Sequence, residues 1–331
     1  MVLAFLLALT RIGIIGADTY HSVAFTKYLN GPKADPAFAD FRVTAVYKGG
    51  SADIESSMSL LKANVPQLEK LGVEFVETVD DLLAKCDAVL LETNDGREHL
   101  AQAEKVFRAG KRVFIDKPLA HDLKDSVAIV ESARKHGATF FTSSAIRYVK
   151  AIRYVKDKGF KVRGMDCWTC FNREKSHDLW YWYGIHAVDP LFAVLGRGCE
   201  EVVSLSGADG EVAIGRWKDG RFGIARGLST EKPGAPYGGV IFTEDAKVGV
   251  NGEKLVDGQI DMGTYEGYKD ELGLVLEYFR TGEVPVSPEE SLEVMAFMTA
   301  ARMSAANGGR AVRIADVLAE VESTKTEGKS K

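Results

Sequence analysis

The sequence predicts an α/β protein in two parts: a doubly wound parallel sheet, then an α+β domain with a mostly antiparallel open sheet. The first observation is the β-branched and aromatic run 111–118, which lies between two amphipathic segments, 97–110 and 122–137. A short run between two helices is typical of a buried parallel strand. The second observation is the series of short strand-like runs over 202–250, separated by turn signals, which indicates an antiparallel sheet.

Length, composition and charge limit the class of protein. The chain has 331 residues, 46% hydrophobic and 27% charged, which is too long for one ordinary core and fits two globular domains. The pattern changes near residue 145, so we predict domains over 1–145 and 146–331. A net charge of −5 without a basic stripe argues against nucleic acid as a partner. Cys167 and Cys170 have no second cysteine pair to complete a zinc site, and no metal site is predicted.

The apolar start of the chain, Met1–Leu9, is too short to span a bilayer, and no membrane partner is expected. It resembles the apolar part of a signal peptide, but no Lys or Arg precedes it and no clear cleavage site follows. A strand, 11–16, begins almost at once. We expect a cytoplasmic protein, with a truncated export leader at residues 1–10 as the open alternative.

Periodicity and turn residues place the remaining elements. The direct repeat of 145–150 in 151–156 is too short for a repeat fold and predicts one basic amphipathic helix. The tail from Ser323 is charged and expected to fray. Other strands are expected at 41–47, 73–77, 88–92, 139–143 and 161–173, and other helices within 52–72 and at 79–85, 97–109, 265–281 and 288–307.

The turn after the first strand is where a dinucleotide-binding fingerprint, Gly-x-Gly-x-x-Gly/Ala, belongs in a Rossmann-type sheet. Here it reads from Gly16 to His21, and only the first glycine is kept. Asp18 brings a Cβ and a negative charge, which both oppose a close phosphate, and His21 is large for tight helix–strand packing. A helix start capped by Asp18 or Thr19 still attracts anions. The alternative is a capped turn that binds nothing.

The end of the second strand normally carries a carboxylate that holds the adenosine ribose. The chain instead has Tyr47 and Lys48, followed by two glycines and Ser51. Lys48 and Ser51 suit a 2′-phosphate, which favours NADP over NAD. A solvated loop is the alternative at this position.

Four stretches in the first part carry a family resemblance. They are 86–94, His99, 109–113 and 116–120, and together they resemble the Gfo/Idh/MocA oxidoreductases, nicotinamide-dependent enzymes of sugars, polyols and related small molecules. The family's usual signature is Glu-Lys-Pro, so Asp116 before Lys117 is a mild departure. The resemblance implies a cofactor, NAD or NADP, and a catalytic role for Lys117. It also implies cofactor contacts from Thr93, Asn94, His99 and Asp116.

Without the resemblance, these same residues have ordinary structural explanations. Asn94 is a good N-cap residue, His99 alone is more often a packed histidine, and the stretch from Asp116 to Pro118 is a polar turn after a strand.

The second part contains a matching motif over 184–189, which resembles the family's Gly-x-His-x-x-Asp and implies that His186 is catalytic. Asp189 shares a helix face with His186, so it could orient the imidazole. Trp182 stands where the family often has an aspartate, and Arg147 matches a family arginine near the substrate. Aromatic side chains over 180–183 suit the apolar face of a sugar ring. Core packing is the alternative for the histidine and for the aromatic run.

The main functional hypothesis is an NAD(P)-dependent oxidoreductase that acts on a sugar, polyol or related small hydroxy compound. Lys117 would deprotonate the reacting hydroxyl, and His186 would shuttle the proton. The alternative is a non-catalytic carbohydrate- or metabolite-binding protein that kept the fold and lost dinucleotide binding. By analogy with the family, we expect a homodimer or homotetramer.

Overall fold

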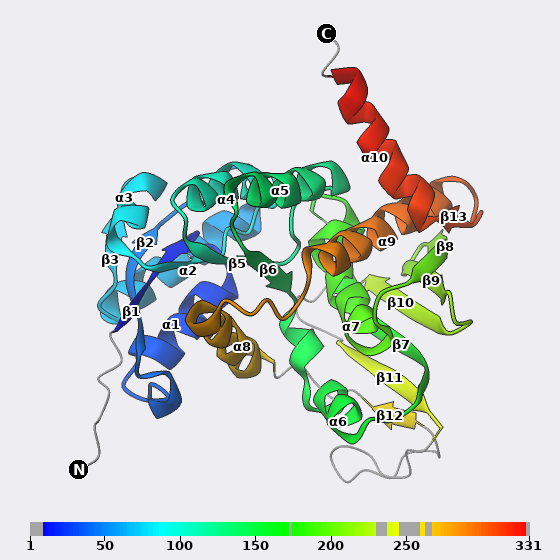
Figure 1. Cartoon of the computed structure of the whole chain (residues 1–331), viewed down its shortest axis with the longest axis horizontal. Helices are drawn as coiled ribbons and strands as arrows, with labels where there is room; N and C mark the ends of the chain where they lie inside the picture. Colours follow the sequence, from blue (N-terminus) through cyan, green and yellow to red (C-terminus); the bar gives the residue numbers. More distant parts are fainter. Residues whose placement is uncertain (1–8, 172–173, 230–236, 245–258, 262–266, 329–331) are drawn as a thin grey trace. The chain divides into compact units, whose positions relative to one another are not determined.

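The protein is described by a computed structural model, which covers residues 9–171, 174–229, 237–244, 259–261 and 267–328 (Figure 1). The chain divides into two compact units. The first comprises residues 1–116, 128–142 and 268–285, and the second comprises 117–127, 143–267 and 286–331. This division differs from a single boundary near residue 145, because the chain returns to the first unit at 268–285.

The first unit contains a six-stranded sheet of order β3-β2-β1-β4-β5-β6. Neighbouring strands run parallel in the β1–β2, β1–β4, β2–β3 and β4–β5 pairs, as expected for a doubly wound sheet. Strands β1, β4, β5 and β6 are buried over most of their length, in keeping with their apolar runs in the sequence. The strands are β1 (Thr10–Ile15), β2 (Phe41–Tyr47), β3 (Glu74–Val76), β4 (Ala88–Leu91), β5 (Arg112–Asp116) and β6 (Phe140–Ser143).

Helices cover both faces of this sheet. Helices α3 and α4 pack on one face, and α1 and α8 pack on the other (Figure 1). The observed bounds of α3 agree with those predicted from the sequence. Thr78 caps this helix by accepting from the Asp81 backbone N–H. The helices are α1 (Tyr20–Asn30), α2 (Glu55–Lys70), α3 (Val79–Lys85), α4 (His99–Arg108), α5 (Leu123–His136) and α8 (Tyr268–Thr281), with a 3-10 turn, η1, at Pro36–Phe38.

The second unit contains a mixed, mostly antiparallel sheet of order β12-β11-β7-β10-β9-β8-β13, in which the β7–β10 pair is parallel. The predicted turns around Asp209 and Asp219 form the β8–β9 and β9–β10 hairpins, whereas the predicted turn at 232–234 lies outside the described residues. The strands are β7 (Val162–Phe171), β8 (Cys199–Gly207), β9 (Gly210–Trp217), β10 (Phe222–Ser229), β11 (Gly238–Thr243), β12 (Gln259–Asp261) and β13 (Val312–Arg313).

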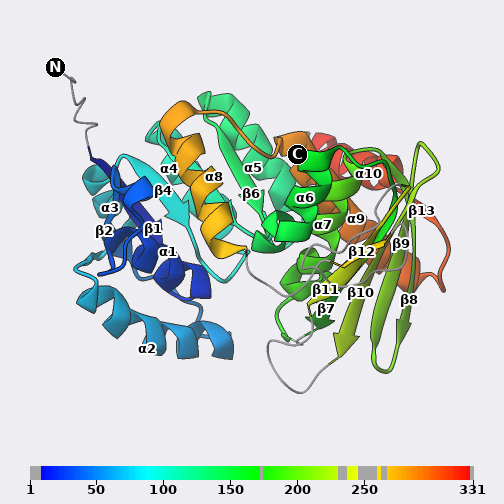
Figure 2. The same ribbon diagram turned by 90° about the horizontal axis from the view of Figure 1, so that it is seen from below.

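Helices α7 and α9 lie against one face of this second sheet (Figure 2). Phe192 on α7, Trp217 on β9 and Phe297 on α9 pack ring against ring and form its buried aromatic core. The helices of the unit are α6 (Lys150–Lys158), α7 (Ile185–Leu195), α9 (Pro288–Ala306) and α10 (Ile314–Gly328), with a 3-10 turn, η2, at Ala145–Tyr148 and a π-helical turn, η3, at Trp180–Gly184.

One prediction for this part of the chain was wrong, and one helix was not expected from the sequence. The repeated hexapeptides do not form one helix. Residues 145–148 of the first copy form the 3-10 turn η2, its Val149 is extended with a ψ of 152°, and α6 begins at its last residue, Lys150, and contains the whole second copy. The segment after residue 313 forms a helix, α10, which the sequence interpretation did not predict.

No helix among the described residues is both long enough and apolar enough to cross a membrane. Residues 1–8 of the apolar start lie outside the described part of the chain, so the expected cytoplasmic location stays a prediction.

Candidate functional site

The turn between β1 and α1 depends on Gly16, the first glycine of the fingerprint. Gly16 has a φ of +95°, and a Cβ at this position would lie 2.5 Å from the Cα of Thr93. Its N–H donates to the carbonyl of Tyr47 at 2.9 Å, which ties the turn to the end of β2. Only glycine combines this backbone conformation with so close an approach, so the first glycine of the fingerprint is retained for a physical reason.

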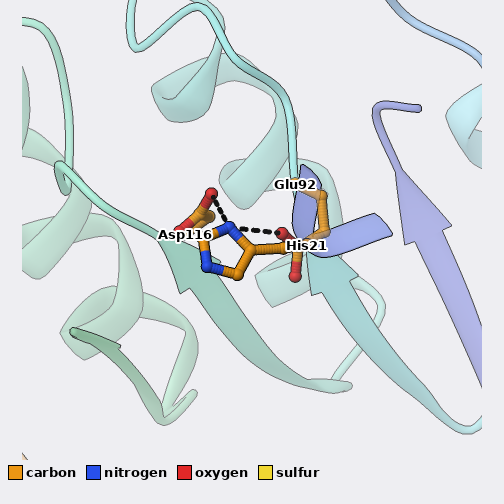
Figure 3. A group of neighbouring side chains, drawn as sticks. All are labelled: His21, Glu92 and Asp116. Atoms are coloured by element: carbon orange, nitrogen blue, oxygen red, sulfur yellow. Dashed lines mark hydrogen bonds and ion pairs between the residues drawn. The ribbon is translucent and has the colours of Figure 1, made fainter. Parts of the chain in front are cut away.

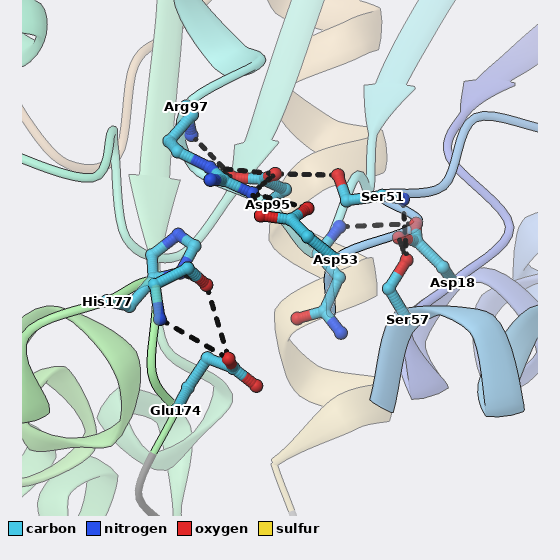
Figure 4. A network of polar contacts seen from close by, with 10 residues as sticks. Asp18, Ser51, Asp53, Ser57, Asp95, Arg97, Glu174 and His177 are labelled. Carbon is cyan, nitrogen blue, oxygen red and sulfur yellow. Dashed lines mark hydrogen bonds and ion pairs between the residues drawn. The ribbon is translucent and has the colours of Figure 1, made fainter. Parts of the chain in front are cut away.

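Asp18, at the second fingerprint position, is fully buried and turned into the protein (Figure 4). Its Oδ2 accepts a 2.6 Å hydrogen bond from the Ser57 hydroxyl, and its Oδ1 accepts a 3.2 Å bond from the Asn94 backbone N–H. Burial raises the pKa of the Asp18 carboxyl, and these hydrogen bonds offset part of that shift. Asp18 therefore links the first turn to the loop after β4 and to α2. The glycine that a dinucleotide fingerprint has at this position would instead leave the backbone exposed to a phosphate.

The start of α1 keeps features that suit an anion. Thr19 occupies the N-cap position, but its side chain does not cap the helix, and its buried Oγ1 forms no hydrogen bond. Asn64 on α2 instead fixes the turn by donating to the carbonyls of Ala17 and Thr19 at 2.9 and 2.8 Å. A hydroxyl without a partner beside the first N–H groups of a helix fits a pyrophosphate oxygen. The residues present therefore fit a dinucleotide in geometry, while the charge of Asp18 opposes it.

The loop after β2 is held by a polar network (Figure 4). Ser51 donates to Asp95 at 2.6 Å, and Arg97 donates to both Asp95 and Asp53. These carboxylates raise the pKa of the Arg97 guanidinium. The Ser51 hydroxyl is thus committed to Asp95, so of the two residues proposed for a 2′-phosphate only the exposed Lys48 remains accessible.

The loop after β4 positions the predicted nicotinamide-side residues. Thr93 donates to Gln102 Oε1 at 2.7 Å, and its carbonyl lies 2.8 Å from Nε2 of the fully buried His99. His99 and Gln102 on α4 thereby fix the backbone from Thr93 to Asn94. Helix α4 begins at His99 rather than at Arg97, and in the turn before it the Asp95 carboxylate accepts from the Arg97 backbone N–H.

Lys117 follows the last residue of β5 and is half-buried. The peptide bond between Lys117 and Pro118 is cis. Asp116, just before it, turns into the first unit and contacts His21 Nδ1 at 2.9 Å. Asp116, which is expected to contact the cofactor, thus has a buried partner that no sequence motif indicates.

In the second unit, His186 lies in the first turn of α7, directly after the π-helical turn η3. Its Nδ1 lies 2.7 Å from the Ser144 hydroxyl, and the rings of Tyr183 and Tyr237 pack against the imidazole at 5.8 and 5.5 Å between centroids. A hydrogen bond at Nδ1 orients the imidazole ring, including Nε2, and sets which tautomer is present. Ser144 was not named from the sequence, because a serine after a strand carries no signal of its own.

Asp189 does not orient His186 directly, contrary to the sequence-based interpretation. Its carboxylate accepts from the Ser144 backbone N–H at 2.9 Å and from both Nε and one terminal nitrogen of Arg147. The link from Asp189 to the imidazole therefore runs through Ser144. The physical reason is that the buried Arg147 guanidinium, 5% exposed, requires a carboxylate in bidentate contact.

Arg147 is the centre of a buried ion cluster in the second unit. Glu290 on α9 contacts, at 2.6 Å, the same terminal nitrogen of Arg147 that donates to Asp189. These two carboxylates raise the pKa of the guanidinium against the opposing effect of burial. Arg147 and Asp189 thus form a direct ion pair. Their role in substrate binding stays a prediction.

The aromatic run before His186 divides into two pairs. Trp180 and Tyr181 are buried and hydrogen-bonded, to Glu211 and Thr299 respectively, and so belong to the core. Trp182 and Tyr183 are half-buried, and the Trp182 ring packs on His177 with centroids 4.8 Å apart. Only the second pair remains a candidate for stacking on a sugar.

The chain resembles known oxidoreductases in both sequence and fold. Residues 10–144 match the model of the oxidoreductase family with an NAD-binding Rossmann fold, GFO_IDH_MocA. The Salmonella typhimurium oxidoreductase YceM is 28% identical over 90 residues, which are 27% of this chain and 29% of YceM. The match thus spans less than a third of the length of this curated relative.

Two solved structures share the fold over most of the chain. The scyllo-inositol dehydrogenase from Lactobacillus casei, solved with NAD(H) and scyllo-inositol, has a TM-score of 0.70 at 16% identity and covers 93% of this chain and 99% of its own. The UDP-N-acetylglucosamine 3-dehydrogenase from Acidithiobacillus ferrooxidans has a TM-score of 0.70 at 19% identity and covers 89% and 97%. Residues 10–144 therefore resemble the Gfo/Idh/MocA family of oxidoreductases, and the chain shares its fold with these two dehydrogenases.

Proposed function

We propose that the protein is an NAD(P)-dependent oxidoreductase that acts on a hydroxyl group of a sugar, polyol or related small compound. The family match supports the reaction class, and the inositol and amino-sugar dehydrogenases of similar fold support the substrate class. One observation carries the proposal: Lys117 directly follows β5 at the family's lysine position, within the family match.

Each of the two candidate catalytic residues has a defined part in this proposal. Lys117, half-buried at the end of a parallel strand, orients the reacting hydroxyl and accepts its proton when the amine is neutral. His186, with Nδ1 fixed by Ser144, passes that proton on through Nε2. A bound nicotinamide dinucleotide would supply the acceptor for the hydride. The residues expected to hold it are Gly16, Thr19, Tyr47, Lys48, Thr93 and Asn94, with Lys48 favouring NADP.

The first experiment is native mass spectrometry of the purified protein with and without NAD(H) and NADP(H). We expect a mass increment of one dinucleotide per chain. Polyols and sugars are then screened with the cofactor that binds, and the absorbance of the reduced nicotinamide at 340 nm identifies the substrate. Lys117→Ala should abolish turnover, and Lys124→Ala, an exposed lysine, should not. Retained turnover in a folded Lys117→Ala protein would contradict the assigned role.

The second candidate function is a metabolite-binding protein that no longer binds a dinucleotide. The buried Asp18 carboxylate at the phosphate-binding turn is the observation that favours it. This alternative predicts sugar or polyol binding by calorimetry and no dinucleotide increment at millimolar cofactor. A dinucleotide increment would exclude it.

We also propose a homodimer or homotetramer that associates through the second sheet. Leu205, Ile214 and Phe222, on three adjacent strands, are 57%, 38% and 52% exposed. Exposed large apolar side chains on one sheet mark a candidate interface. The same native mass spectra report the oligomeric state, and a monomer at micromolar concentration would contradict this proposal.

A further inference from the structure

A buried group of ionisable side chains in the first unit lies outside the residues assigned to catalysis. His21 on α1, Glu92 directly after β4 and Asp116 at the end of β5 point toward one another (Figure 3). His21 Nδ1 lies 2.9 Å from Asp116 Oδ2 and 4.0 Å from Glu92 Oε2. One ligand atom from each of the three lies within 4.8 Å of the others.

A fourth residue completes the group on the other side of the imidazole. Glu271 on α8 places Oε2 3.7 Å from His21 Nε2, and this nitrogen forms no hydrogen bond despite its burial. The side chains of His21, Glu92, Asp116 and Glu271 are 4%, 0%, 1% and 0% exposed. Buried carboxylate oxygens and an imidazole nitrogen that lie this close together form a donor set that suits a metal ion.

We propose that His21, Glu92 and Asp116 bind one divalent transition-metal ion, with Glu271 holding the imidazole. Neutral imidazole and two carboxylates are ligands for ions from Mn²⁺ to Zn²⁺, whereas Mg²⁺ prefers oxygen ligands alone. Two ionised carboxylates cancel the charge of the ion. Coordination through Nδ1 places the imidazole proton on Nε2, which faces Glu271.

This last contact is what a metal-bound histidine requires. A ligating histidine nearly always donates its other ring N–H to a carboxylate, carbonyl or water, which fixes the tautomer. The unused Nε2 and the Glu271 carboxylate, 3.7 Å apart, match that arrangement. His21 also stands at the third glycine position of the fingerprint, so one departure from the dinucleotide pattern supplies the nitrogen ligand.

The site would join α1, the ends of β4 and β5, and α8, which the chain reaches only at residue 268. Its expected effect is therefore to stabilise the first unit through ligands distant in sequence. The inference does not rest on the proposed dehydrogenase activity, and its test needs no substrate or dinucleotide.

The test uses the full chain, stripped with a chelator and then supplied with Zn²⁺, Mn²⁺ or Mg²⁺ separately. We expect one Zn²⁺ or Mn²⁺ per chain by elemental analysis after desalting, with little retained Mg²⁺, and a raised melting temperature. Glu271→Gln should weaken the affinity by about 10- to 100-fold, the usual loss for such an outer partner. His21→Ala and Glu92→Gln should abolish retention.

The matched control is a second group, His121, Asp122 and Asp125, whose ligand atoms are also close but whose side chains are 25–41% exposed. His121→Ala should leave metal retention unchanged. The proposal would be overturned if His121→Ala lost the metal ion while His21→Ala retained it. It would also be overturned if the wild-type chain retained no metal ion.

A measurement on the wild-type protein covers the case in which the buried variants do not fold. The Co²⁺-loaded chain should show visible d–d absorption and one exchangeable, paramagnetically shifted imidazole N–H signal. That proton is the one on Nε2 of His21. A Co²⁺ complex with no shifted, exchangeable imidazole proton would contradict ligation by His21.

Discussion

The Asp18 carboxylate accepts a 2.6 Å hydrogen bond from the Ser57 hydroxyl, in a fully buried position where the family fingerprint has a glycine. This contact joins the first turn of the sheet to α2. It also places an acid beside the helix start that would receive the pyrophosphate. Cofactor affinity should therefore depend on the charge of this one residue.

Asp18→Asn should strengthen dinucleotide binding by about tenfold, which corresponds to roughly 1.4 kcal/mol of relieved repulsion. The asparagine keeps a carbonyl that accepts from Ser57 or from the Asn94 N–H. Calorimetry with NAD(H) and NADP(H) measures the change. Asp53→Asn, an exposed acid in the neighbouring loop, is the control and should have a small effect. Weaker binding in Asp18→Asn would show that the carboxylate helps to form the site.

The pH dependence of dinucleotide binding should follow Asp18. Burial raises the pKa of this carboxyl, so the neutral acid persists to a higher pH than in an exposed aspartate. Repulsion of the pyrophosphate appears only when the carboxyl ionises, and affinity should fall as pH rises through the raised pKa. Fluorescence titrations between pH 4.5 and 8 test this in the wild type and in Asp18→Asn, whose profile should be flatter. Parallel profiles would exclude Asp18 as the titrating group.

The same pKa shift predicts a difference in stability between these two proteins. The folded state holds the Asp18 proton more tightly than the unfolded chain, so this residue stabilises the fold at low pH. That contribution is lost as pH rises from the unfolded pKa through the raised folded pKa. The free energy of unfolding of Asp18→Asn, relative to wild type, should therefore increase with pH in urea titrations. A constant difference would mean that Asp18 has a similar pKa in both states.

Ser144 should act as a positioning residue for His186. Its hydroxyl lies 2.7 Å from Nδ1, and its backbone N–H is anchored on Asp189. Ser144→Ala removes the contact that fixes the tautomer, so kcat should fall with a smaller change in KM, and the pH profile of kcat should shift. Ser144→Thr keeps the hydroxyl and should restore much of the rate. An unchanged pH profile in Ser144→Ala would assign the contact a purely structural role.

Much of the first sheet was predictable because its buried strands and amphipathic helices have distinct periods. Helix α3 and strand β2 were predicted with their observed bounds, and β5 was identified from its apolar run. The local sequence pattern gave the wrong secondary structure where tertiary contacts determine it. The identical hexapeptides at 145–150 and 151–156 differ in structure: most of the first copy forms a buried 3-10 turn whose arginine pairs with Asp189, whereas the second copy lies within α6.

The candidate site was predictable only in part, and for the same reason. Lys117 and His186 belong to local motifs, so the sequence could identify them. The partners of His21 lie just after β4, at the end of β5 and on α8, and nothing within a short window links Glu92 or Glu271 to that histidine. Ser57 and Asn64, which hold the first turn, likewise lie on α2, 39 and 47 residues from their partners Asp18 and Ala17.

The repeat provides a controlled test of the Arg147 cluster. Arg147→Met leaves Asp189 and Glu290 without their buried partner, which should destabilise the protein by about 3–5 kcal/mol. Arg153 holds the same place in the second hexapeptide but is half-buried, and Arg153→Met should cost less than about 1 kcal/mol. Urea unfolding of both variants measures the difference. Equal losses would mean that the cluster adds no more stability than an arginine on α6.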